Sequence, residues 1–207
     1  KMLSFLSFLK ESAKPIRQGV LAFGRMNPPT AGHEQVVNKL HEVADKVGGE
    51  HKLVLSGTTG TKDGKNPLTP EQKLKHAKRA FPNTNIEVAD EKAPTILHHA
   101  AKMYASGIRN LHFVGGSDRK PMHELLQKYN GKEGKHGYYN FKDIEFHNAG
   151  DRDENAKGTA GISGTKLRGL VANGKKEEFK AACSSQMKPA HREELYNDLR
   201  KAGGHND

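Results

Sequence analysis

Residues 19–40 read GVLAFGRMNPPTAGHEQVVNKL: an apolar run, a polar turn rich in glycine and proline, and then apolar residues at helical spacing. The run at 19–23 predicts a buried strand, and the later spacing predicts a helix over 32–47. A helix that begins just after a strand presents unpaired backbone N–H groups and the positive end of its dipole. The turn therefore predicts a binding site for phosphate or another anion.

Strand and helix patterns alternate along the rest of the chain. Apolar runs predict strands at 19–23, 52–56, 85–89, 110–114 and 143–147, and amphipathic patterns predict helices at 32–47, 69–80, 93–106 and 117–129. This alternation is typical of an α/β protein, and we expect a Rossmann-like five-stranded parallel sheet flanked by helices. Such a sheet binds ligands at the carboxyl ends of its strands, near the point where the strand order reverses.

Three polar, glycine-rich loops are expected at those carboxyl ends, at 24–33, 56–61 and 115–119. Glycine lets a ligand approach the backbone closely, so the coincidence of the loops favours one shared site. A fourth loop, at 130–141, is long, basic and aromatic. Two interpretations of it stay open, a lid over a substrate and a solvated excursion.

A second motif, Ile162-Ser163-Gly164-Thr165-Lys166-Leu167-Arg168, lies late in the chain. Ser163 is well placed as a helix N-cap, which brings hydroxyl groups, backbone N–H groups and a guanidinium to the start of one helix. Arginine binds phosphate oxygens through paired hydrogen bonds, so the two motifs together predict a triphosphate site. Helical patterns at 166–173, 175–182 and 189–202 predict a small C-terminal helical tail.

The composition limits the kind of partner. The chain has 207 residues, enough for a substantial core, and no apolar stretch approaches the roughly 20 residues of a membrane span. A formal net charge of +10 favours polyanionic partners: nucleotides, nucleic acid or an anionic surface. The chain has no tryptophan and only 6% aromatic residues, so nucleic acid is not the favoured partner. Cys183 is the only cysteine and cannot form an internal disulfide, which favours a reducing compartment.

The first sixteen residues make a separate amphipathic segment. Leucine and phenylalanine at positions 3–9 form an apolar face, and Ser12-Ala13-Lys14-Pro15 separates it from the first strand. The segment is too short to span a membrane. A helix packed on the domain is the favoured interpretation, and a docking helix or a targeting peptide are the alternatives.

The two motifs resemble the signatures of the nucleotidyltransferase superfamily, which are (His or Thr)-x-Gly-His after the first strand and Ile-Ser-x-Thr-x-x-Arg late in the chain. Thr30-Ala31-Gly32-His33 matches the first, and 162–168 matches the second at every fixed position. The resemblance covers 17–185, the expected nucleotidyltransferase domain, which lies between the amphipathic segment at 1–16 and the helical tail at 186–207.

Finer resemblances point to two branches of that superfamily. The turn at 24–28 with the Gly-His pair is similar to the nicotinamide-nucleotide adenylyltransferases, whereas 161–165 is similar to the glycerol-phosphate cytidylyltransferases. Arg168 favours the adenylyl side. The loop at 130–141 and the dense lysine usage resemble members encoded by tailed bacteriophages.

The resemblance implies transfer of AMP from ATP to a small phosphorylated acceptor, with nicotinamide mononucleotide favoured, and release of pyrophosphate. It also implies Mg²⁺ held mainly by the triphosphate. The alternative enzyme is a cytidylyltransferase that uses CTP and a sugar or polyol phosphate. The alternative of another class is a non-catalytic basic module for nucleic-acid binding or virion assembly. The implied location is the cytoplasm, the host cytoplasm for a phage-encoded protein, with the virion as the alternative.

The resemblance also assigns roles to residues. His33 is expected to donate to the α-phosphate, and Thr30 is expected to add a hydroxyl donor where other members carry a second histidine. Arg168 completes the catalytic set by binding the leaving pyrophosphate. The other residues expected to bind nucleotide are Gly24, Arg25, Asn27, Gly32, Gly115, Ser117, Asp118, Arg119, Ser163 and Thr165.

A few other residues attract attention but receive no role in the predicted site. Adjacent His98 and His99 point about 100° apart on a helix and cannot chelate one metal in the i, i+4 manner. The mixed charges at 151–154 are typical of a solvated loop, and Cys183 lacks a motif for nucleophilic catalysis. Lys62 and Lys65 are typical loop lysines.

Overall fold

The computed structural model describes residues 4–12, 14–150 and 162–204, and they form an α/β fold around one parallel sheet. All five predicted strands and the predicted fold class are confirmed. The strands are β1 (Gln18–Gly24), β2 (Glu50–Leu55), β3 (Ile86–Val88), β4 (Asn110–Gly115) and β5 (Asp143–Asn148).

The order of the strands determines where a ligand can bind. The order is β3-β2-β1-β4-β5, and every pair of neighbours is parallel. The chain runs outward from β1 to β3 and then crosses to β4, on the other side of β1. The order therefore reverses between β1 and β4, where open α/β sheets form their ligand crevice.

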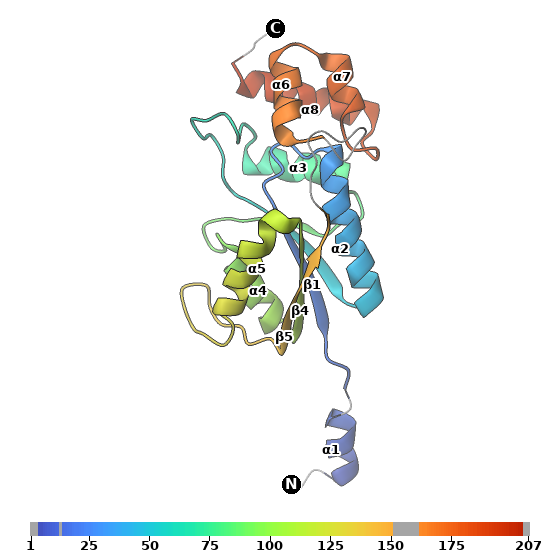
Figure 1. The fold of residues 1–207 in the computed structure, drawn as a ribbon, viewed down its shortest axis with the longest axis vertical. Coiled ribbons are helices and arrows are strands. Elements are labelled where there is room, and N and C mark those ends of the chain that lie inside the picture. Colours follow the sequence, from blue (N-terminus) through green and yellow to red (C-terminus); the bar gives the residue numbers. More distant parts are fainter. Residues whose placement is uncertain (1–3, 13, 151–161, 205–207) are drawn as a thin grey trace.

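Helices cover both faces of the sheet (Figure 1). The helices α2 (Glu34–Val47) and α3 (Pro70–Ala80) share one apolar cluster with Val20 of β1. The helices α4 (Ile96–Ala105) and α5 (Lys120–Lys128) share the other cluster with Leu21. Val20 and Leu21 face opposite ways because side chains alternate along a strand. Short 3₁₀ turns, Ala31–His33 and Ser117–Arg119, precede α2 and α5.

Three helices follow the sheet and pack at the end where the strands terminate (Figure 1). They are α6 (Gly164–Ala172), α7 (Lys176–Ala181) and α8 (Pro189–Ala202). Their apolar residues join the same cluster as α2 and α3. The last three predicted helices are thus confirmed, with small shifts at their ends.

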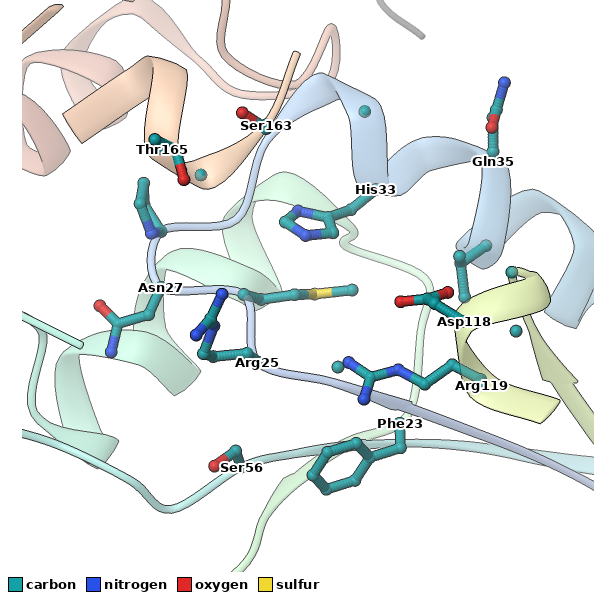
Figure 2. A pocket seen from close by; sticks show the side chains of 18 of the residues that line it. Phe23, Arg25, Asn27, His33, Gln35, Ser56, Asp118, Arg119, Ser163 and Thr165 are labelled. Atoms are coloured by element: carbon teal, nitrogen blue, oxygen red, sulfur yellow. The ribbon is translucent and has the colours of Figure 1, made fainter. Parts of the chain in front are cut away.

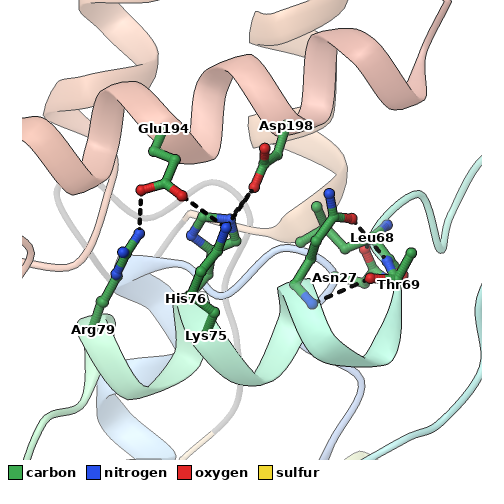
Figure 3. A network of polar contacts seen from close by, with 9 residues as sticks. Asn27, Leu68, Thr69, Lys75, His76, Arg79, Glu194 and Asp198 are labelled. Atoms are coloured by element: carbon green, nitrogen blue, oxygen red, sulfur yellow. Dashed lines mark hydrogen bonds and ion pairs between the residues drawn. The ribbon is translucent and has the colours of Figure 1, made fainter.

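A polar network fastens α8 to α3, as Figure 3 shows. Glu194 accepts hydrogen bonds from Lys75 at 2.8 Å and Arg79 at 2.6 Å, and Asp198 lies 2.7 Å from the ring of His76. Lys75, followed by Arg79, holds the pKa of Glu194 at about 2. The C-terminal helices are therefore attached to the domain by charge as well as by apolar packing.

The N-terminal helix α1 (Phe5–Ser12) lies apart from the sheet (Figure 1). Phe5 is 74% exposed and Leu6 70% exposed, so the predicted packing of this segment on the domain is wrong. The apolar clusters on the two faces of the sheet are built with other helices and include neither Phe5 nor Leu6. Within the described ranges, no helix is both long and apolar enough to cross a bilayer.

The loop at 130–141 leads into the amino end of β5, opposite the end where the crevice opens, so its interpretation as a lid is wrong. Most of the loop is exposed, as the solvated interpretation expects, but Tyr139 and Phe141 anchor it in the apolar cluster that α4 and α5 share. Tyr139 is fully buried and donates a hydrogen bond to the Leu126 carbonyl at 2.6 Å. Asn130 closes the loop with two hydrogen bonds to the backbone of Phe141.

Candidate functional site

A pocket of about 740 Å³ opens at the carboxyl ends of β1 and β4. Both motifs contribute to it, as Figure 2 shows. Its lining residues are Phe23, Gly24, Arg25, Met26, Asn27, Pro28, Gly32, His33, Gln35, Val36, Ser56, Gly115, Gly116, Ser117, Asp118, Arg119, Gly150, Ser163, Gly164, Thr165 and Arg168.

Every predicted site residue except Thr30 lines this pocket, although Gly24 and Arg168 lie 144 positions apart in the chain. Of the predicted loop at 56–61, only Ser56 reaches the pocket, and Lys62 and Lys65 do not. Sequence reasoning missed Phe23, Gln35, Val36 and Gly150. Phe23, Gln35 and Val36 adjoin the first motif, so the alternation of side chains along the strand and their spacing along the helix could have indicated that they face the same pocket.

His33 ends the 3₁₀ turn before α2, and its ring projects into the pocket (Figure 2). The backbone N–H of Thr30 donates to Nδ1 of His33 at 2.9 Å. Nδ1 is therefore an acceptor, and the imidazole carries its hydrogen on Nε2. A backbone contact thus selects the tautomer and orientation of the ring. This arrangement preorganises an N–H donor, as stabilisation of a developing charge requires.

The hydroxyl of Thr30 has a different role from the one predicted. Thr30 is fully buried, and its Oγ1 donates to the Ile162 carbonyl at 2.9 Å. The prediction of a hydroxyl that contacts phosphate is therefore wrong, because this donor is committed to the second motif. Thr30 positions His33 through its backbone and joins the two motifs through its side chain.

Gly32 reinforces the same junction. A Cβ atom at this position would lie 2.1 Å from the Ile162 carbonyl oxygen, which no real contact permits. A side chain at Gly32 would therefore clash with the backbone of the second motif. The two motifs approach each other at van der Waals distance because position 32 has no side chain.

Asn27 connects three segments. Its side-chain Oδ1 accepts from the Leu68 N–H at 2.9 Å, and its Nδ2 donates to the Leu68 carbonyl at 3.3 Å. Its own carbonyl accepts a hydrogen bond from Nη1 of Arg168 at 2.8 Å. Asn27 was predicted to bind nucleotide. Its side chain instead holds the chain before α3 against the first motif.

The start of α6 supplies the other wall of the pocket. Oγ of Ser163 accepts from the Lys166 N–H at 3.1 Å, which confirms Ser163 as the helix N-cap. The first backbone N–H groups of a helix lack intrahelical acceptors, so those at Gly164 and Thr165 suit an anion. Arg168 lies one turn later, and its Nη2 donates to Oγ1 of Thr165 at 3.1 Å.

Positive charge dominates the described lining of the pocket. Among the described residues, three arginines line it, Arg25, Arg119 and Arg168, whereas Asp118 is the one carboxylate. Burial, together with the charge of Arg25, lowers the pKa of the Arg168 guanidinium. The guanidinium of Arg119 lies 5.3 Å from the centre of the Phe23 ring, so a planar cation and an aromatic face meet at the pocket floor.

Lys73 of α3 is a buried cation behind the pocket that sequence reasoning missed. Its side chain is fully buried, and Nζ donates to the Ser56 carbonyl at the end of β2. Burial, with a contribution from Arg25, lowers the pKa of Lys73 to about 8. Lys73 lies on the same face of α3 as the buried Ala77 and Ala80, so its helical spacing could have predicted that it is buried.

The residues without a predicted role remain outside the pocket. The ring of His98 contacts the Thr95 hydroxyl, whereas His99 contacts the Ala93 carbonyl, so the two rings do not share a ligand. Cys183 is buried, and burial raises its thiol pKa to about 11, which makes a thiolate nucleophile unfavourable. The charged residues at 151–154 lie outside the described residues.

Comparison with known proteins adds little to this geometry. No protein-family model matches the sequence, and no curated protein matches it. A solved structure of a Vibrio parahaemolyticus protein assigned as a nicotinate-nucleotide adenylyltransferase is similar, with a TM-score of 0.48 and 16% identity over 87% of this chain and 99% of that chain. A likeness of this size carries no argument, so function must be inferred from the pocket itself.

Proposed function

We propose that the protein is a nucleotidyltransferase that transfers AMP from ATP to a small phosphorylated acceptor, with nicotinamide mononucleotide the favoured acceptor, and releases pyrophosphate. The observation that carries this proposal is the convergence of the His33 N–H donor, the N-terminus of α6 and Arg168 on one pocket. Each group is a donor or a cation, and none is an activated nucleophile. Such a set suits direct transfer between phosphates.

The reaction is an in-line displacement at the α-phosphorus of the triphosphate. An oxygen of the acceptor phosphate forms the new P–O bond, and the bond to pyrophosphate breaks. Negative charge grows on the leaving group, so the protein contributes by positioning and by fixed positive potential. His33 donates from Nε2 at the α-phosphate. The N-terminus of α6 and Arg168 bind the leaving phosphates.

The metal in this proposal arrives with the substrate. Asp118 is the one carboxylate among the lining residues, so the described part of the pocket offers Mg²⁺ very few oxygen ligands. Mg²⁺ retains water and favours phosphate oxygens, so this lining suits a magnesium–triphosphate complex. The remaining sides of the pocket, at Phe23, Arg119 and Ser117, would hold the base and ribose.

The test is a pyrophosphate-release assay with purified protein, Mg²⁺, either ATP or CTP, and a panel of phosphorylated acceptors. We expect release with ATP and nicotinamide mononucleotide. Release only with CTP and a polyol phosphate would replace the proposed donor and acceptor, and no release with any pair would contradict the proposal.

A matched pair of variants attributes the activity to the pocket. His33→Ala should abolish most of the release, whereas His98→Ala, which removes a histidine of α4 outside the pocket, should retain it. Circular dichroism of both variants checks that the fold is intact. Tight, salt-sensitive DNA binding unaffected by His33→Ala, in a protein without transferase activity, would favour a nucleic-acid-binding module.

A further inference from the structure

We propose that the protein has a Zn²⁺ site formed by His112 of β4 and by Glu145 and His147 of β5. This site is separate from the pocket, and no residue of it lines the pocket. The inference does not rest on the proposed function. Among the described residues, this is the one group of three histidine, cysteine or acidic side chains close enough to hold a metal ion.

The sheet register brings the three side chains together. His112 pairs directly with Glu145 in the β4–β5 ladder, and His147 follows two residues later on β5. Side chains two residues apart on a strand lie on the same face, and neighbours across a ladder do as well. The cluster therefore sits on the α2 side of the sheet, where Val114, two residues after His112, joins the α2 apolar cluster.

The distances suit a small divalent ion. Nδ1 of His112 lies 2.8 Å from Nε2 of His147 and 3.5 Å from Oε2 of Glu145, and the remaining edge of the triangle measures 3.9 Å. Zn²⁺ binds nitrogen and oxygen at about 2.0–2.2 Å, which places tetrahedral ligand atoms roughly 3.3–3.5 Å apart. The observed edges bracket that value, so changes of at most about 0.7 Å in the distances between ligand atoms would complete the site.

A second residue already prepares His112 as a ligand. Oε1 of Gln18, at the start of β1, lies 2.7 Å from Nε2 of His112. An amide oxygen can only accept, so the ring donates from Nε2 and turns the lone pair of Nδ1 towards Glu145 and His147. In zinc sites, the other ring nitrogen of a histidine ligand usually donates to an oxygen, and Gln18 supplies that oxygen here.

The metal-free state follows from the same tautomer. Since Nδ1 of His112 carries no hydrogen, Nε2 of His147 must donate the hydrogen bond between the two rings. A zinc ion would replace this shared hydrogen, and His147 would then carry its hydrogen on Nδ1. Besides the small shifts of the ligand atoms, binding of the ion therefore needs a change of tautomer at His147 alone.

Charge and access also fit. The Glu145 side chain is 55% exposed and His147 is 20% exposed, so an ion can enter from the side of edge strand β5. Two imidazoles and one carboxylate suit Zn²⁺, with water in the fourth position. Lys39 and Lys46 of α2 add positive charge near His147, and the Glu145 carboxylate offsets part of it.

The experiment is a calorimetric titration of the chelator-treated full chain with ZnCl2. We expect one ion per chain, and an unfolding midpoint that rises by about 5–10 °C at a hundredfold excess over Kd. Glu145→Gln and His147→Ala should each weaken binding at least about tenfold. His51→Ala is the matched control, since it removes one ring of a separate histidine pair, His41 and His51, and should leave binding unchanged.

Gln18 provides a second, independent measurement. Gln18→Ala should weaken zinc binding about 10- to 100-fold, and Gln18→Glu, which keeps an acceptor for Nε2 of His112, should restore it. Co²⁺ in place of Zn²⁺ should give visible absorption that Glu145→Gln changes. Failure of the wild-type chain to bind Zn²⁺, or binding that survives both Glu145→Gln and His147→Ala, would overturn the proposal.

Discussion

The two motifs that line the pocket differ in how far their polar groups are buried. In the first motif, Asn27 and Thr30 are buried, and their side chains bond to the backbone of Leu68 and Ile162. In the second, Thr165 is exposed and Arg168 half-buried at the start of a helix. The first motif is thus a rigid frame, and the second presents donors to solvent.

This difference indicates that the two motifs have different functions in the proposed reaction. A donor that stabilises charge as it develops must be held in place beforehand, and the frame does this for His33. Groups that bind a flexible triphosphate tail only need to exchange water for phosphate oxygens, which exposed donors do at little cost. The comparison predicts that substitutions in the first motif affect catalysis or stability, and that substitutions in the second affect nucleotide binding.

His33→Ala should have the largest effect. Loss of one preorganised donor should lower kcat about 100- to 1,000-fold, with a small change in KM for ATP. Steady-state pyrophosphate release at varied ATP measures both constants. A variant with unchanged kcat and a raised KM would break the comparison, since His33 would then act in binding like the second motif.

Gly32→Ala tests the junction between the motifs. The new Cβ would meet the Ile162 carbonyl at 2.1 Å, and we expect a loss of about 1–3 kcal/mol in the free energy of unfolding, measured by urea denaturation. Gly169→Ala in α6 is the control, because nothing lies within 4 Å of its Cβ. It should stabilise the chain by roughly 0.5–1 kcal/mol through helix propensity. Equal stability of the two variants would disprove a close junction.

Arg168→Lys tests the binding half of the comparison. A lysine keeps the charge but cannot donate to both the Asn27 carbonyl and a phosphate with a planar fork. We expect KM for ATP to rise about 10- to 100-fold while kcat falls less. A larger fall in kcat than rise in KM would place Arg168 with His33 in the rigid frame.

Lys73→Met should have the smallest effect and should depend on pH. The pKa of Lys73 is about 8 in the folded chain and near 10.5 unfolded, so the unfolded chain binds more protons between these values. Stability from this group therefore rises with pH, by on the order of 1 kcal/mol from pH 7.5 to 9. The variant should lack this rise. Urea denaturation at both pH values measures it, and identical pH slopes for variant and wild type would count against a buried charged lysine.

Much of this architecture could be predicted because local patterns suffice for it. All strands appear where apolar runs predicted them, and Ser163 caps α6 as predicted. Contacts between distant segments could not be predicted in the same way. The acceptor of the Thr30 hydroxyl, the partner of Asn27 and the burial of Lys73 each depend on a segment brought close by folding.

The sequence alone determined the order of elements, the parallel sheet and the residues that surround the pocket. The order of elements and the sheet follow from hydrophobic periodicity and from turn and cap chemistry, which act over a few residues, whereas the residues around the pocket follow from the resemblance of the two motifs to a known superfamily. Only the tertiary structure decided which of those residues face a ligand and which hold the frame. It also decided that His112, Glu145 and His147 meet. A side chain's hydrogen bonds depend on its neighbours in space, and strand register and helix packing choose those neighbours.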